Sequence, residues 1–106
     1  MIVDDGVLAS VRRYCVLDGG DEMRLTELIY AAAADLRSRG VPEPAGAWGS
    51  ADGIRPLYEL ALKAMVLYYH DHPDTTGETE GLPPGVRQLV NQLRIAAVAE
   101  QYRVEE

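Results

Sequence analysis

Apolar residues recur at intervals of three and four positions along most of the chain, which is the spacing that places them on one face of an α-helix. Four segments show this spacing, and stretches rich in Gly, Pro and Asp separate them. The pattern predicts an all-α fold, a small bundle of about four helices with two flexible loops and an extended C-terminal helix. The expected helices cover residues 7–17, 21–39, 56–70 and 84–102.

The residues at the segment ends are of the types that start and stop helices. Asp4 or Asp5 can cap the first helix, and Asp18-Gly19-Gly20 ends it with residues that form turns readily. Gly40 follows the last apolar position of the second helix, so we expect it to form the C-cap. Pro56 suits the first turn of the third helix. Local signals therefore support these boundaries.

The third segment carries a wider apolar surface than a single helix–helix contact requires. One face consists of Leu57, Leu60, Ala61, Ala64, Leu67 and Tyr68, and further apolar residues widen it: Tyr58, Met65, Val66 and Tyr69. Such a helix either lies at the centre of the bundle or is shared with another subunit. On the second interpretation, we expect Tyr58, Met65 and Tyr69 to lie at a subunit interface.

Two loops connect the last three segments. Residues 41–53 contain two prolines and three glycines, which excludes a helix or a long strand. Trp48, the only tryptophan, lies in the middle of this loop. It either folds back onto the core or anchors a neighbouring subunit, because aromatic residues are enriched in interface hot spots. Residues 71–81 form the second loop, which is polar and acidic.

The last segment begins with Gly81-Leu82-Pro83-Pro84-Gly85, a rigid turn that leads into an amphipathic helix. The first apolar stripe of this helix consists of Val86, Leu89, Val90 and Leu93. The stripe then shifts, and the apolar residues that point toward a different surface are Ile95, Val98 and Tyr102. We therefore expect a single domain over residues 1–106, in which residues 95–106 protrude.

Length and charge limit the functional classes. The chain of 106 residues is long enough for one domain with a core of its own. Its formal net charge of −7 argues against a protein that wraps DNA, because phosphate binding needs concentrated Lys and Arg. The first residues lack the pattern of a signal peptide, and no apolar run approaches the ~20 residues of a membrane span. We expect no association with a membrane.

No residue pattern points to catalysis. Cys15, the single cysteine, lies on the apolar face of the first expected helix, where we expect a buried role rather than a nucleophilic one. His70 and His72 are the only histidines, and a His-x-His pair on a helix points its rings apart. The glycine motifs that bind phosphate are missing from the sequence. We expect no enzymatic activity, no bound metal and no cofactor.

The stretch Leu82-Pro83-x-Gly85-Val86-Arg87-x-Leu89 resembles the closing motif of the head-tail connector proteins of tailed bacteriophages, also called adaptor or head-completion proteins. Members of that family are short and mostly helical, with a Gly/Asp-rich turn, an Ala-rich helix, a variable loop and a helix that ends in Tyr-rich sequence. This chain carries similar segments in the same order, at 7–16, 18–22, 25–36, 57–70 and 82–93. Residues 41–53 depart from the family, because they lack the β-branched alternation of a projecting hairpin.

The resemblance implies a structural protein of a phage or prophage virion, assembled in the cytoplasm of the host bacterium. It implies a homo-oligomeric ring that binds the portal protein and a stopper or tail protein, while DNA passes through the channel without sequence-specific binding. The candidate portal contacts are then Ile95, Val98 and Tyr102, and the candidate subunit contacts are Trp48, Tyr58, Met65 and Tyr69. The alternative is a small acidic helical interaction or regulatory module, similar to an antitoxin.

Overall fold

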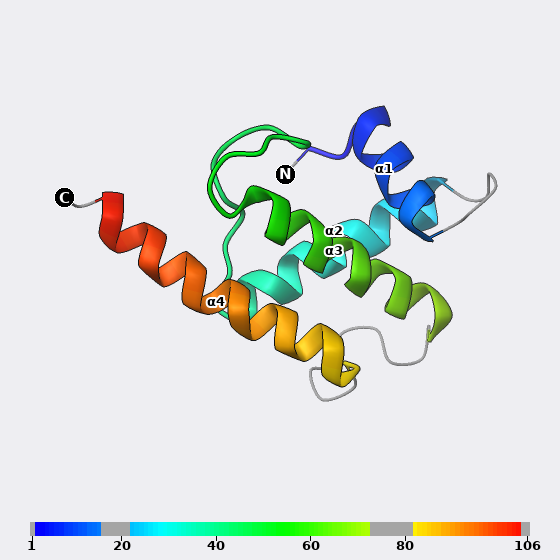
Figure 1. Ribbon diagram of the computed structural model, residues 1–106. Helices are drawn as coiled ribbons and strands as arrows, with labels where there is room; N and C mark the ends of the chain where they lie inside the picture. Colours follow the sequence, from blue (N-terminus) through cyan, green and yellow to red (C-terminus); the bar gives the residue numbers. More distant parts are fainter. Residues whose placement is uncertain (1, 16–21, 73–81, 105–106) are drawn as a thin grey trace.

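The computed structural model describes residues 2–15, 22–72 and 82–104, and this part of the chain is all-α (Figure 1). It forms α1 (Asp5–Cys15), α2 (Glu22–Ser38), α3 (Arg55–Asp71) and α4 (Pro84–Val104). The predicted fold class is confirmed, and the described helix ends lie within two residues of the expected ones. The predicted turn at residues 18–20 and most of the predicted acidic loop at residues 71–81 lie outside the described residues.

Helix α3 lies at the centre of the bundle and contacts α1, α2 and α4. All four helices contribute buried side chains, and the largest fully buried ones include Tyr58, Tyr69, Leu28, Ile29, Leu36, Leu62, Met65 and Leu93. A helix with three neighbours needs apolar residues around most of its circumference. The central position therefore explains the wide apolar surface of this segment.

Three of the predicted subunit contacts belong to this core, and that prediction is corrected. Tyr58, Met65 and Tyr69 are at most 1% exposed, so their side chains meet other helices of the same chain. A neighbouring subunit cannot reach them in this fold. Sequence periodicity shows that a helix face is apolar, but it does not show whether the covering helices come from the same chain.

The ends of the first two helices follow the local signals. The backbone N–H of Val7 donates to Oδ1 of Asp4 at 3.0 Å, which caps α1. Gly40 has a φ of +92°, a conformation that favours glycine. This turn lets the N–H of Val41 donate to the carbonyl of Leu36 at 2.9 Å, the 6→1 hydrogen bond of a Schellman motif. The predicted C-cap role of Gly40 is confirmed.

A buried carboxylate connects α2 to α3. Asp35 accepts hydrogen bonds from the hydroxyl of Tyr69 and, at 3.0 Å, from Nε of Arg39. Burial, together with the hydrogen bond to Asp35 and its charge, raises the pKa of Tyr69 well above its usual range. Each oxygen of this buried carboxylate therefore has a donor, as burial of a charged group requires.

The loop at residues 41–53 is fastened to α3 by a buried arginine. Arg55 donates from Nε to Oε2 of Glu59 at 2.8 Å and from Nη1 to the carbonyl of Pro44 at 3.2 Å. Its guanidinium carbon lies 5.7 Å from the centre of the Trp48 ring. Trp48 is half-buried and packs against the core. Trp48 thus folds back onto the core, which is one of the two roles expected for it from the sequence.

Helix α4 has two parts with different surroundings. Val90 and Leu93 are buried against the bundle, whereas Ile95 and Val98 are exposed. Figure 1 shows the C-terminal part of α4, drawn in orange and red, extending away from the other helices. Ala96 and Ala97 lie on the same side of α4 as Leu93 and are half-buried, so the burial of this uninterrupted helix against the bundle decreases beyond Leu93.

Candidate interaction surface on the C-terminal helix

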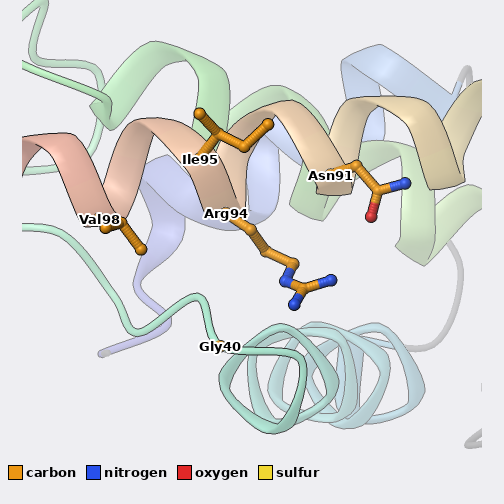
Figure 2. Close-up of a pocket in the computed structure, with 5 residues that line it drawn as sticks. All are labelled: Gly40, Asn91, Arg94, Ile95 and Val98. Carbon is orange, nitrogen blue, oxygen red and sulfur yellow. The ribbon is translucent and has the colours of Figure 1, made fainter.

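A hollow of about 540 Å³ lies between α4 and the C-terminal end of α2 (Figure 2). The residues that line it are Gly40, Asn91, Arg94, Ile95 and Val98. The four from α4 are spaced i, i+3, i+4 and i+7, so one face of this helix forms one wall. Gly40, at the end of α2, marks the other side. We call this region the α4 hollow.

The apolar wall of the α4 hollow is exposed. Ile95 is 73% exposed and Val98 is 52% exposed, although both are large aliphatic side chains. Single exposed apolar residues are common on protein surfaces, but two neighbours on one helix face beside a hollow are more informative. The structure thus places two of the three predicted portal contacts together on one accessible surface.

The third predicted portal contact, Tyr102, also lies in α4. It is four residues beyond Val98, the spacing at which side chains share a helix face. Its side chain lies outside the described part of the structure. The assignment of Tyr102 therefore remains a prediction.

Arg94 gives the α4 hollow its charge. Figure 2 shows its side chain extending from α4 toward the end of α2. Its Nε lies 3.8 Å from the position that a Cβ atom on Gly40 would occupy. The carbonyl groups at a helix C-terminus carry partial negative charge, which attracts a guanidinium group. The last turn of α2 therefore favours a cation at this place.

The lining of the α4 hollow suits binding rather than catalysis. The described residues that line it offer one guanidinium group, one amide and two aliphatic side chains, and none of these residues is acidic. None of these groups is a nucleophile paired with a base, the arrangement that covalent catalysis requires. Exposed aliphatic groups beside a cation are instead suited to a protein segment that brings apolar side chains and a carboxylate.

The residues of the Leu-Pro-x-Gly-Val motif build the entry to α4 rather than the hollow. Leu82 is buried, and Val86 and Leu89 pack against the core from its edge. The N–H of Arg87 donates to the carbonyl of Pro83 at 3.0 Å and closes the first turn. The exposed members of the motif are Gly85 and Arg87. This motif therefore fixes where α4 starts and which of its faces meets the bundle.

A smaller hollow of about 230 Å³ is lined by residues of α1, α3 and the start of α4. The rings of Tyr68 and His72 stack in it with their centroids 4.4 Å apart. His72 also places Nδ1 3.1 Å from the carbonyl oxygen of Tyr68, near the end of α3. These contacts give His72 a role at a helix C-terminus.

The thiol of Cys15 is buried at the end of α1. Burial raises its pKa, and the nearby charge of Asp71 raises it further. A raised pKa disfavours the thiolate, which is the nucleophilic form of cysteine. The surroundings of Cys15 therefore resemble those of a structural cysteine.

The sequence did not predict that Gly40 and Arg94 are neighbours in the fold. Gly40 was expected to end a helix, and that expectation is confirmed, but its nearness to α4 depends on how the helices pack. Arg94 lies beside the apolar stripe of the last helix, which hints only that it faces solvent. The proximity of Gly40 and Arg94 could not be predicted, because it depends on helix packing and no local sequence pattern encodes that packing.

Comparisons with protein-family models, with curated proteins and with solved structures found no match for this chain. Within the described ranges, no group of three or more His, Cys, Asp or Glu side chains is placed to hold a metal ion. No helix of the same ranges combines the length and the apolar character needed to cross a membrane. The interpretation of the α4 hollow therefore rests on its own geometry.

Proposed function

We propose that this chain is a head-tail connector subunit of a tailed bacteriophage or prophage. Copies of it form a ring between the portal and a stopper or tail protein and extend the channel through which DNA passes. The observation that carries this proposal is the C-terminal part of α4, which leaves the bundle and exposes Ile95 and Val98. In the ring, this part of α4 docks on the portal.

An unsupported helix end is a reason to expect a partner. Most helical stability in proteins comes from packing an apolar face, and short helices are marginal in water without it. The residues of α4 beyond Leu93 place Ile95 and Val98 in solvent instead. A partner that covers them removes apolar surface from water and stabilises the helix at the same time.

The rest of the molecule is suited to a repeated structural subunit. Its core closes around α3 within a single chain, so each copy can fold before it assembles. The net charge of −7 disfavours adhesion to DNA phosphates, which a channel that conducts DNA should avoid. The resemblance of the Leu82–Leu89 stretch to the closing motif of the connector family supplies the link to this particular assembly.

The test is co-assembly with the portal protein encoded in the same phage or prophage genome. We expect negative-stain images and sedimentation to show an added layer on the portal ring when the two proteins are mixed. The double variant Ile95→Asp with Val98→Asp should abolish this layer, because it places two carboxylates on the docking face. Its circular dichroism and melting temperature should stay close to those of the wild type, since both side chains are exposed.

A matched control variant distinguishes the loss of the docking face from a general effect of adding two carboxylates to α4. Gln92→Asp with Ala99→Asp adds the same two carboxylates to exposed positions of the same helix, but neither residue lines the α4 hollow. This variant should still form the layer. Docking that survives the Ile95 and Val98 changes would refute the role of α4. A wild-type protein that stays monomeric or dimeric beside a competent portal would favour the small regulatory module instead.

A further inference from the structure

Two apolar surfaces outside α4 are exposed as well. The first, which we call the α2 stripe, consists of Met23, Glu27 and Tyr30; Met23 is 74% and Tyr30 is 47% exposed. The second, which we call the α3 patch, consists of Tyr14, Leu60 and Lys63, and both of its apolar residues are exposed. Each surface thus combines two large apolar side chains with one charged residue.

The two surfaces face opposite sides of the molecule. Helix α2 packs on α3 through buried residues such as Leu28 and Ala32, and the α2 stripe lies on the other side of its helix. Helix α3 buries Tyr58 and Met65 toward its neighbours, and Leu60 lies about half a turn away from them. Since the buried faces of α2 and α3 point toward each other, their exposed faces point away from each other.

The charges of the two surfaces are opposite. Glu27 is exposed in the centre of the α2 stripe, and its ion pair with Arg24 is long, at 4.0 Å, and open to solvent. In the α3 patch, Nζ of Lys63 lies 5.7 Å from the centre of the Tyr14 ring. Within the described residues, Lys63 takes part in none of the ion pairs. Each surface therefore presents the charge that the other attracts.

We propose that the α2 stripe of one copy binds the α3 patch of a second copy. Met23 and Tyr30 then meet Tyr14 and Leu60, and Glu27 meets Lys63. A contact between different surfaces on opposite sides of a subunit is heterologous, so it repeats from copy to copy and closes into a ring when the rotation permits. This inference rests on the proposed connector function and identifies the surfaces through which neighbouring subunits in the ring touch.

A two-fold contact is the less favourable arrangement of the same surfaces. In a symmetric dimer through the α2 stripe, Glu27 would oppose Glu27 of the other copy near the axis. In a symmetric dimer through the α3 patch, Lys63 would oppose Lys63. Like charges in an interface cost binding energy, whereas the heterologous contact pairs opposite charges.

The experiment uses two charge reversals, Glu27→Lys and Lys63→Glu, in the full chain without any portal. Self-association is measured by sedimentation velocity at rising concentration, up to the millimolar range. We expect the wild type to self-associate and each single variant to associate roughly ten-fold more weakly, because a like-charge pair replaces an opposite-charge pair. In an equimolar mixture, every contact between two unlike variants pairs opposite charges again, so the mixture should associate nearly as the wild type does.

Two controls carry the same charge changes outside both surfaces. Asp52→Lys matches the first reversal and Arg87→Glu matches the second, and both positions are exposed. They should associate as the wild type does. The inference is overturned if the wild type stays monomeric over the whole range, if either reversal associates as tightly as the wild type, or if the mixture associates no better than the single variants.

The outcomes also separate this inference from the connector proposal. If the charge exchange behaves as expected but no layer forms on the portal, the contact between copies stands and the connector proposal fails. If the layer forms on the portal equally well with each reversal alone, the connector proposal stands and the contact between copies fails. The Ile95 and Val98 double variant should retain wild-type self-association in both cases, because it leaves the α2 stripe and the α3 patch unchanged.

Discussion

Arg55 is a charged residue at a position where charge is expensive. It is 2% exposed, yet Glu59, Glu43 and the carbonyl of Pro44 accept hydrogen bonds from its guanidinium group. Glu59 accepts a further bond from the N–H of Gly49 at 2.8 Å. The loop at residues 41–53 thus lacks regular structure but is attached to α3 at several points.

Replacing Arg55 by Ala should therefore loosen the loop and destabilise the fold. We expect the free energy of unfolding to fall by about 3–5 kcal/mol, because the buried carboxylate of Glu59 loses its countercharge. Urea titration measures this loss, and the fluorescence of Trp48 should change in the folded state. Arg87→Ala removes an exposed arginine and should cost less than about 0.5 kcal/mol. Equal stability of the two variants would contradict the anchoring role of Arg55.

Tyr58 makes stability depend on alkaline pH. Burial raises its pKa from 10.0 to about 12, and the charge of Glu43 adds to the shift. Between these values, the unfolded chain has lost a proton that the folded chain still holds, so rising pH favours unfolding. The contribution is complete below about pH 10 and disappears as the pH rises toward about 12.

The check is urea unfolding followed by circular dichroism at about pH 9 and about pH 11. The wild type should lose stability between the two, and Tyr58→Phe should lose less, because one of the buried hydroxyls no longer titrates. The raised pKa of Tyr69 acts in the same direction and should leave part of the loss in place. Tyr30→Phe changes an exposed tyrosine and should follow the wild type. A Tyr58→Phe variant with the full loss would disprove the assignment.

At the scale of elements, α4 buries Val90 and Leu93 in its first part and exposes Ile95 and Val98 in its second. Leu93 is fully buried and Ile95, two residues later, is exposed, so one helix offers a matched pair of aliphatic positions. Leu93→Ala should reduce the free energy of unfolding by about 2–5 kcal/mol, as large-to-small changes in a core do. Ile95→Ala should cost less than about 0.5 kcal/mol.

Chemical denaturation of the two alanine variants tests this division of α4. A large loss of stability in Ile95→Ala would show that the second part of the helix packs on the chain itself. The α4 hollow would then be a part of the core rather than a surface for a partner.

The elements themselves could be predicted from the sequence, because helical periodicity and end signals are local. The cap at Asp4, the stop at Gly40 and the change of face after Leu93 each depend on a few neighbouring residues. What lies against a helix is not local. Arg55 and Glu59 look like an exposed i, i+4 pair in the sequence, and only the covering loop makes them buried. For the same reason, the prediction that Tyr58 and Met65 lie at a subunit interface was wrong.

At the scale of the whole molecule, charge and exposed apolar surface are distributed unevenly. Helix α4 carries three arginines and one glutamate, so it is net positive in a chain whose net charge is −7. The exposed large apolar residues of α1 to α4 gather beside Glu27, Lys63 and Arg94. On the proposed connector function, these separate surfaces allow one copy to contact neighbouring copies and the portal at the same time.

The exposed end of α4 also affects how strongly a single copy can bind. A short helical end without packing is marginal in water. On the proposed connector function, a lone copy therefore orders this segment when it docks on the portal, and its individual contact is weak. In a ring, the first contact holds the neighbouring copies at a high effective concentration over their own sites. In the proposed connector, avidity would then make attachment depend on the completeness of the ring: lone copies would dissociate quickly, whereas a closed ring would stay on the portal.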